Sequence, residues 1–446
     1  MNQNQIDELT KINKYLINDF LNNDKDELIN EFNQFIKEYY ITKSNTGAND
    51  LSKGDDDDDE YGIVYVTGDK YYWLTILSIK YIRHNLKDNI PIELFMPYYD
   101  IKDELICNTI NSIYGNIKCS FFSNYISKTM IDNFDKGYQY KSLALLLTRF
   151  KNSLYLDSDN FLIIKPKKLF NSEIFNRNGL ILWPDFWKRS THPNFYKFTN
   201  LIKNNKKNSI IDYPSVESGQ ILINKSNHIK TLILSYYYNF YGPSHYYPIF
   251  NQGFPGEGDK ETLFLSSKII DENVYLIKNS RTKILGYQEQ ITNKFFGQCI
   301  LQKNPENLNE FAFLHCNYPK LFLLNDNEIN LINSNNKNDK IELNNNLNDD
   351  KNLNFKNEIN NSLNRRNLRI FRNAKSEINS ENSNSKNINQ SIDIDIELKI
   401  WENFKLILNE DFVNYKDNFQ FLKIYNNDYV NKKIDKKINF LLSNKY

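Results

Sequence analysis

The 446-residue sequence contains little glycine, proline, cysteine or histidine, and each shortage argues against a class of protein. Its 4 cysteines include no Cys-x-x-Cys pair, so neither a disulfide-rich scaffold nor a structural zinc site is expected, and one or two disulfides or free thiols remain open. The 5 histidines leave little room for a histidine-rich metal centre. The 14 glycines and 11 prolines lie below the roughly 7% and 5% of average proteins, so any cluster of glycines is informative.

The sequence also lacks an excess of charge and a long apolar run. Lys and Arg number 56 and Asp and Glu 55, which argues against a nucleic-acid-binding function. No segment approaches the roughly 18 apolar residues of a membrane span, and the first residues lack the basic start and apolar run of a signal peptide. We therefore expect no visible membrane anchor. Aromatic residues make up 14% of the chain, enough for a substantial core.

The composition changes along the chain and divides it into four segments. We expect a polar helical leader that ends in an acidic linker, a folded domain, an Asn-rich low-complexity insertion, and a helical segment that packs back on the domain. These segments are residues 1–60, 61–323, 324–395 and 396–446.

The folded segment alternates between strand and helix patterns. Residues 61–70, 90–97 and 152–164 are typical of strands, and helical periodicity separates them. This alternation predicts an α/β fold with a mostly parallel sheet flanked by helices. Further strands are expected at residues 179–186 and 218–225, and near 274–279.

An acidic pair follows one predicted strand directly. Asp157 and Asp159 come just after the apolar residues 154–156, and residues two apart in an extended chain project to the same side. Open α/β sheets bind ligands at the carboxyl ends of their strands. Carboxylate oxygens there suit Mg²⁺ or Mn²⁺, which would neutralise a nucleotide diphosphate. An Asp-x-Asp alone is usually a surface turn, but the buried strand before this one favours a metal site.

Two other segments carry candidate donor-site residues. His315 follows an apolar, strand-like run and is either a nitrogen ligand of a Mn²⁺ site or a hydrogen-bonded structural residue. Lys320 would face a phosphate from the same region. Lys141 opens the predicted helix before the acidic pair, which places it near a nucleotide.

Glycines and tryptophans mark further candidate pockets. The glycine cluster at 253–258 is followed by Asp259, which reads as a helix N-cap, and with Glu257 it offers two acids for acceptor binding or base catalysis. The segment 183–189 is either a sugar-stacking wall or an aromatic core corner. It and the strand start at 217–220 hold the remaining candidates, which are Trp183, Asp185, Trp187, Arg189, Glu217 and Gln220.

Several blocks occur in the order seen in one known family. They include GIVYVTGDK, GYQYKSLALLLTRF, WPDFW, GEGDKE and FLHCNYPKL. Over about residues 61–323 the chain resembles the fungal α-mannosyltransferases of the mannan side-chain type, glycosyltransferase family 71. The resemblance implies a glycosyltransferase-A fold, GDP-mannose as donor, a mannose-terminated oligosaccharide as acceptor, Mn²⁺ as cation and retention of the α configuration.

The resemblance also carries over some positions. Asp157, Asp159 and His315 match the metal site, Thr67, Gly68 and Lys70 match the first nucleotide loop, and Lys141 matches a basic residue that faces the donor. Trp183, Asp185, Glu217, Gln220, Glu257 and Asp259 fall in blocks expected to line the donor-sugar and acceptor pockets, without individual roles. From the residues themselves we expect Asp157, Arg189 and Lys320 also to bind the donor, Asp259, Glu257, Asp185 and Glu217 to be the catalytic candidates, and Trp183, Trp187 and Gln220 to bind sugar or acceptor.

The resulting expectation is a retaining, metal-dependent α-1,2-mannosyltransferase. An α-1,3 linkage and a catalytically silent glycan-binding homologue are the alternatives. The resemblance implies a Golgi location, with a Golgi glycosyltransferase complex as a partner, although no anchor is visible and the Asn-rich insertion is unusual for the family. Front-face attack with Asp259 or Glu257 orienting the acceptor hydroxyl is the favoured mechanism; a covalent intermediate would need Asp185, Glu217 or Asp259 beneath the anomeric carbon.

Overall fold

The computed structural model describes residues 11, 60–134, 137–185, 189–199, 201, 213–251, 258–277, 283–288, 295–316, 383–415, 418–425 and 428–443. The chain forms two compact units. The first contains residues 1–71, 88–282 and 302–313, and the second contains residues 72–87, 283–301 and 314–446. The predicted leader and most of the predicted insertion lie outside the described residues, so their structure stays a prediction.

A seven-stranded sheet forms the centre of the first unit, in the order β3-β2-β1-β4-β7-β6-β8. Strands β3, β2, β1 and β4 run parallel to one another, β6 runs parallel to β8, and β7 between β4 and β6 is antiparallel to both. The strands are β1 (Tyr61–Val66), β2 (Ile92–Met96), β3 (Ile117–Phe121), β4 (Asn152–Leu156), β6 (Leu180–Pro184), β7 (Val216–Asn224) and β8 (Tyr275–Leu276). This sheet confirms the predicted mostly parallel α/β class.

The strands in the middle of this sheet are largely buried. In β1 the residues 62–65 are all buried, as is usual for a parallel strand covered on both faces. The register pairs Val64 of β1 with Tyr155 of β4. Gly62 lies against the ring of Phe150, so a β-carbon at this position would overlap that ring.

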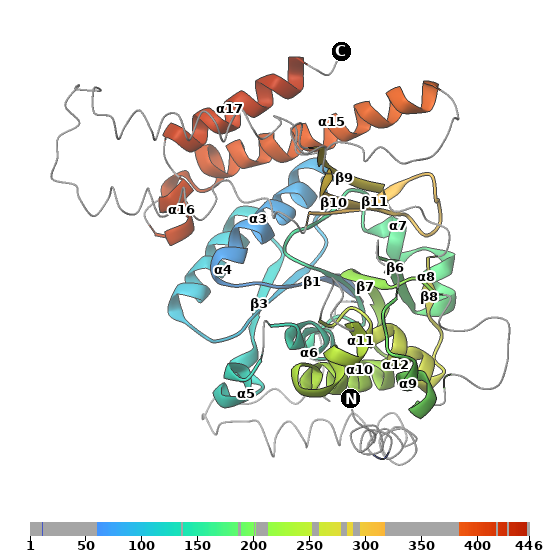
Figure 1. Ribbon diagram of the computed structural model, residues 1–446. Coiled ribbons are helices and arrows are strands. Elements are labelled where there is room, and N and C mark those ends of the chain that lie inside the picture. The colour runs from blue at the N-terminus through green and yellow to red at the C-terminus, as the bar shows by residue number, and fades with distance from the viewer. Residues whose placement is uncertain are drawn as a thin grey trace, which may run out of the picture. The chain divides into compact units, whose positions relative to one another are not determined.

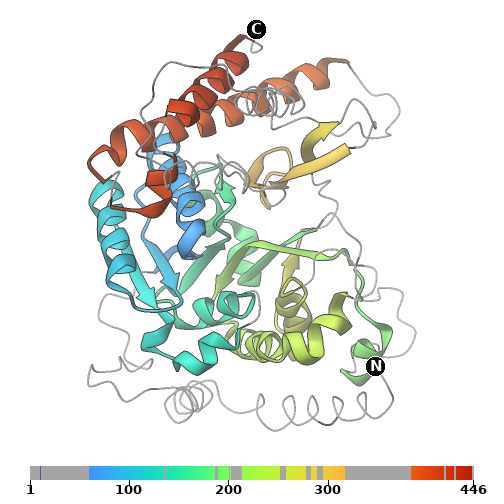
Figure 2. The ribbon, with the colours of Figure 1, turned by 60° about the vertical axis from the view of Figure 1, so that its left-hand side comes forward.

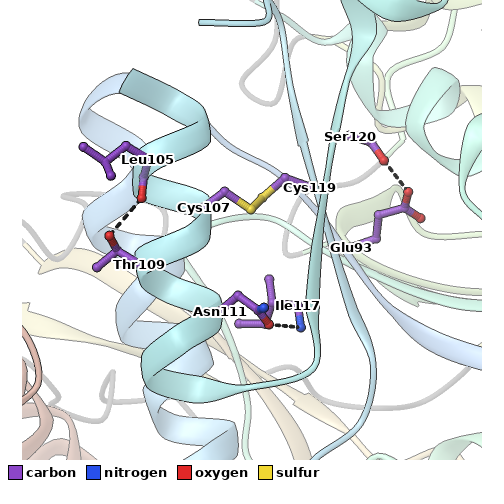
Figure 3. The surroundings of a disulfide bond; sticks show 8 residues. All are labelled: Glu93, Leu105, Cys107, Thr109, Asn111, Ile117, Cys119 and Ser120. Atoms are coloured by element: carbon purple, nitrogen blue, oxygen red, sulfur yellow. Dashed lines mark hydrogen bonds between the residues drawn. A yellow bond between two sulfur atoms is a disulfide. The ribbon is translucent and has the colours of Figure 1, made fainter. Parts of the chain in front are cut away.

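Helices α6, α10, α11 and α12 gather on one face of the seven-stranded sheet (Figures 1 and 2). Helix α4 instead packs beside β3, to which the Cys107–Cys119 disulfide joins it (Figure 3). The α-helices of this unit are α4 (Ile101–Tyr114), α5 (Lys128–Asp132), α6 (Gln139–Leu147), α7 (Lys167–Phe170), α8 (Glu173–Asn178), α9 (Pro193–Phe198), α10 (Ile229–Phe240), α11 (Tyr247–Asn251) and α12 (Thr262–Ile270).

A second, four-stranded sheet has the order β5-β11-β10-β9. Its strands are β5 (Asn160–Leu162), β9 (Lys283–Gln288), β10 (Phe295–Lys303) and β11 (Phe311–His315). Strand β11 begins in the first unit, and its last two residues belong to the second. The β9–β10 hairpin was not predicted. Of this sheet, the sequence analysis recognised the strand-like run that becomes β11 and, at the end of residues 152–164, the run that becomes β5.

Helices from both ends of the described chain form the second unit. Trp73 of α3 (Tyr72–Lys80) stacks on Phe404 with ring centroids 5.4 Å apart, and Lys80 pairs with Asp411 at 2.8 Å. The partners lie on or next to α15 (Ser383–Leu406), which packs against α17 (Asp428–Ser443); α16 (Gln420–Tyr425) completes the set. The segment at 72–87 therefore packs with the C-terminal helices, although the sequence assigned it to the catalytic domain.

Helix α15 also begins earlier than the sequence indicated. Its first residue, Ser383, lies inside the range predicted as a low-complexity insertion, which was expected to end at 395. Once the apolar turns around Trp401 nucleate a helix, propagating it through Asn, Ser and Lys costs little. None of the helices in the described part of the chain has both the length and the apolarity that a bilayer crossing requires.

Candidate functional site

The acidic pair lies on a turn that the two strands beside β4 hold in place. The Asp157 amide donates to the Gly219 carbonyl of β7 at 2.9 Å, and the Ser158 hydroxyl donates to the Val66 carbonyl at the end of β1 at 3.1 Å. The Asn160 amide closes the turn on the Asp157 carbonyl at 2.9 Å. Backbone contacts on both sides therefore fix the carboxyl end of β4, where the sequence placed the pair.

Asp157, Asp159 and His315 form a cluster that could hold a metal ion. One ligand atom from each lies within 4.8 Å of the other two. The carboxylate of Asp157 is 30% exposed, whereas Asp159 and His315 are buried. His315 ends β11, which is hydrogen-bonded beside β5 through the Ile163 amide and Ala312 carbonyl at 2.9 Å. Two carboxylates and one imidazole are a donor set that suits Mn²⁺, so the residues present fit such an ion.

Lys141 lies in the first turn of α6 and directs its ammonium group at the acidic turn. Its Nζ lies 3.3 Å from Asp157, 3.0 Å from Asp259 and 2.7 Å from the Ser218 carbonyl. Burial lowers the pKa of this lysine, but the two carboxylates outweigh burial and the net effect is a raised pKa. Lys141 therefore carries its charge at neutral pH.

Asp259 is buried beside Lys141, near the start of α12. Burial raises the pKa of its carboxyl group and the Asp157 charge adds to the increase, while Lys141 opposes both. Asp259 is not the N-cap that the sequence predicted, because α12 begins at Thr262 and Glu261 is its N-cap residue. Asp259 instead accepts from the Thr262 amide through its own carbonyl, at 3.0 Å. Its carboxylate is thus left for Lys141 and Ser218, whose hydroxyl lies 3.4 Å away.

Two residues of this cluster were missed by the sequence analysis. The Tyr155 hydroxyl donates to Asp157 at 2.9 Å, and Ser218 contributes both its carbonyl and its hydroxyl to Lys141. Burial, and then the Asp157 charge, raise the pKa of Tyr155, which keeps it a donor. The signal for Tyr155 was its place two residues before Asp157, on the same side of the strand. No local signal marked Ser218.

Glu217 and Gln220 belong to a buried hydrogen-bond network. Gln220 donates to Glu217 at 2.6 Å and accepts from Asn160 at 2.6 Å, while Gln302 donates to Glu217 at 2.9 Å. Because Asn160 closes the acidic turn, this network connects the two candidates to the metal cluster. Their contacts in this structure are with protein groups on β5, β7 and β10.

The tryptophan segment divides into a core residue and a charged one. Trp183 is 0% exposed, donates to the Lys303 carbonyl at 2.8 Å and packs edge-on against Phe313. It therefore does not form an exposed stacking wall, and the alternative reading of an aromatic core corner holds for it. Asp185, just after β6, pairs with Lys260 at 3.2 Å beside the Asp259 turn.

Arg189 is buried in an ion pair. Its Nε lies 3.2 Å from Glu261, its Nη2 donates to the Pro214 carbonyl at 2.9 Å, and its guanidinium lies over the Phe264 ring. Ser215 donates to the other Glu261 oxygen at 2.5 Å. This pair anchors the start of α12, and the predicted contact of Arg189 with a donor diphosphate stays a prediction.

The predicted first nucleotide loop follows β1. Thr67 is buried and its amide donates to the Phe95 carbonyl of β2 at 2.9 Å. Gly68 has φ +155° and Asp69, a non-glycine residue, has φ +46°, so the chain turns sharply at this strand end. The Lys70 side chain and the residues Trp187, Glu257 and Lys320 lie outside what the structure describes, and their roles stay predictions.

Comparison with known proteins identifies the family. Residues 60–214 and 210–317 match the mannosyltransferase family model Mannosyl_trans3. The chain belongs to this family. It is 36% identical over 300 residues to the α-1,2-mannosyltransferase MNN21 of Candida albicans, covering 58% of this chain and 45% of that protein. It is also 29% identical over 461 residues to MNN22 of the same organism, covering 91% and 77%.

The family extends to budding yeast. The α-1,2-mannosyltransferase MNN2 of Saccharomyces cerevisiae is 36% identical over 272 residues, which cover 54% of this chain and 45% of that protein. This mannosyltransferase-family chain thus spans about half the length of several of its curated relatives. The resemblance to fungal mannan α-mannosyltransferases is confirmed.

Solved structures that resemble this family member include two sugar-transferring enzymes. One is the galactosyltransferase LgtC with donor and acceptor sugar analogues, at a TM-score of 0.35 and 15% identity, covering 49% of this chain and 74% of that one. The other is the mannosyltransferase Ktr4p of S. cerevisiae, at a TM-score of 0.34 and 12% identity, covering 62% and 84%.

Proposed function

We propose that this protein is a retaining, metal-dependent α-mannosyltransferase that moves mannose from GDP-mannose to a mannose-terminated glycan and forms an α-1,2 linkage. The observation that carries the proposal is the Asp157, Asp159 and His315 cluster at the carboxyl end of β4, in a chain that belongs to a mannosyltransferase family. Relatives named α-1,2-mannosyltransferases favour that linkage over α-1,3.

Asp157, Asp159 and His315 would hold the cation, for which we propose Mn²⁺. When bound, the cation supplies positive charge to the departing diphosphate. The loop that contains Thr67, Gly68 and Lys70 follows β1, the strand beside β4. Because ligands bind at the carboxyl ends of such strands, we propose that this loop contacts the nucleotide. Lys320 and Arg189 remain proposed contributors to the same oxygens.

Retention of configuration is assigned to front-face attack. A covalent intermediate needs a free carboxylate beneath the sugar, and all three candidates contact other protein groups. Glu217 accepts from Gln220 and Gln302, and Asp185 pairs with Lys260. Asp259 pairs with Lys141. We propose that Asp259, together with Glu257, orients the acceptor hydroxyl. Trp187 and Gln220 are proposed to line the sugar and acceptor pocket.

The cysteines support an oxidising compartment for this reaction. All 4 are paired, as Cys107–Cys119 and Cys299–Cys316. Disulfides form and persist in the secretory pathway and are rare in the cytosol. Together with the fungal relatives, this pairing favours action in the secretory pathway, and we propose the Golgi, with other glycosyltransferases as partners.

The test is transfer to α-mannobiose from a panel of sugar nucleotides with Mn²⁺, with the product linkage assigned by NMR. We expect an α-1,2-linked product from GDP-mannose alone. Asp157→Ala should lose at least about 100-fold in rate, as when a group that stabilises transition-state charge is removed. Asp435→Ala, which removes an exposed pair with Lys405, is the control and should retain full rate.

Two outcomes would contradict the proposal. Transfer by Asp157→Ala at the wild-type rate would remove the metal cluster from the reaction. Binding of α-mannobiose without turnover of any sugar nucleotide would instead identify the silent glycan-binding homologue. An α-1,3 product would correct the linkage and leave the rest of the proposal standing.

A further inference from the structure

We propose that Lys141 is a positioning residue that couples the metal-site carboxylate Asp157 to Asp259. The resemblance assigned this lysine to the donor, but the structure points its ammonium group at protein acceptors. In the proposed role, Lys141 fixes the position of the Asp259 carboxylate relative to the cluster that would hold the cation. Asp259 is the group proposed to orient the acceptor hydroxyl. The inference therefore rests on the proposed function.

The contacts of the ammonium group account for all its donors. A lysine has three N–H bonds, and four protein oxygens lie within reach of Nζ. The Ser218 carbonyl lies at 2.7 Å, Asp259 at 3.0 Å, the Ser218 hydroxyl at 3.1 Å and Asp157 at 3.3 Å. The Lys141 side chain is only 10% exposed. Contact with a diphosphate would require it to give up a buried bond.

A second contact holds the same turn against the same helix start. Gly258, just before Asp259, has φ +118°, and a β-carbon there would lie 3.0 Å from the Tyr138 ring. Tyr138 immediately precedes α6, and Lys141 lies in that helix's first turn. The Gly258–Asp259 turn is thus held by packing against Tyr138 and by the charge of Lys141.

The charge balance explains why a lysine serves here. Asp259 is a buried negative charge and Asp157, 30% exposed, adds a second one beside it, so the pair would be costly without a nearby cation. Lys141 lies between them and forms an ion pair with both. A bound cation would compete with Lys141 for the Asp157 carboxylate. Lys141 would still hold Asp259, to which its contact is shorter.

The decisive variant is Lys141→Met, which keeps the unbranched stem of the side chain and removes its ammonium group. We expect kcat to fall about 100-fold, because misplacing a reacting group by about 1 Å costs that much. The donor KM and the Mn²⁺ affinity, measured by electron paramagnetic resonance, should stay within about threefold. A donor KM raised tenfold or more, with kcat near wild type, would show a direct donor ligand and overturn the inference.

The coupling to Asp259 is tested by a double-mutant cycle on kcat. If Lys141 acts through Asp259, adding Asp259→Asn to Lys141→Met should cost less than about twofold more, because the two residues act as a unit. Losses that multiply would overturn the coupling. If Lys141→Met does not fold, Lys141→Arg is measured instead. Arginine retains the charge but displaces the contact with Asp259. A lower kcat with an unchanged donor KM supports the inference, and a raised donor KM with an unchanged kcat overturns it.

Lys80→Met is the matched control, because Lys80 is also a buried lysine paired with an aspartate, Asp411. It should lower the free energy of unfolding and leave kcat unchanged. The controls also separate the two proposals. If wild type transfers mannose and Lys141→Met does so at the same kcat, only this inference fails. If wild type uses no sugar nucleotide, the proposed function fails.

Discussion

The two disulfides provide a matched pair of perturbations, one at the proposed metal site and one away from it. Cys107–Cys119 joins α4 to β3 and has a sequence separation of 12, whereas Cys299–Cys316 has a separation of 17 and its second cysteine directly follows His315. Loop-closure entropy depends only on the logarithm of loop length, so each disulfide stabilises the folded chain by about 3 kcal/mol.

We expect the two double Cys→Ser variants to lose similar stability and to differ in metal binding. Cys299→Ser/Cys316→Ser releases the end of β11, where His315 lies, and should weaken Mn²⁺ binding at least about tenfold, in the range seen when a ligand loses its support. Cys107→Ser/Cys119→Ser should leave Mn²⁺ binding unchanged. Near this disulfide the Ile117 amide also donates to Asn111 at 2.9 Å, so a contact between α4 and β3 remains (Figure 3).

The measurements are urea unfolding and Mn²⁺ titration followed by electron paramagnetic resonance. Equal Mn²⁺ affinities in the two variants would refute the idea that the second disulfide positions His315. A difference of several kcal/mol between their free energies of unfolding would refute the argument from loop length. Either result can be reached with the purified chain and needs no donor or acceptor.

Three further predictions concern single positions. Because burial raises the pKa of Asp259, transfer should fall as the pH drops through a value above that of an ordinary aspartate; the pH–rate profile of Asp259→Asn should lack this acid limb. Gly62→Ala should lower the free energy of unfolding by about 1–3 kcal/mol through overlap with the Phe150 ring, and Gly62→Ala/Phe150→Leu should recover part of the loss in thermal melts. Arg189→Met should cost about 3–5 kcal/mol in urea unfolding because it leaves Glu261 buried and unpaired, and Arg189→Met/Glu261→Leu should regain most of it; no loss in the single variant would contradict the buried pair.

Local patterns predicted the strands of the first sheet. The runs 62–65 and 153–156 are buried on both faces and mostly apolar, so their composition identifies them without knowledge of the rest of the chain. The β9–β10 hairpin was missed because its place in a sheet depends on pairing with distant strands. The division of the chain was also missed, because residues 72–87 pack with helices that lie more than 300 positions away.

The site shows the same division between local and distant causes. The sequence alone predicted Asp157 and Asp159 as candidate metal ligands, because two carboxylates directly after a buried strand are a pattern that local sequence reveals. Tertiary structure decided what surrounds them. The sequence and the structure both place Lys141 in the first turn of a helix. Its partner Ser218 lies 77 positions further along the chain, so only the folded sheet brings the ammonium group to it. It also decided that Trp183 is a core residue, because the composition of an aromatic segment is the same whether water or protein covers it.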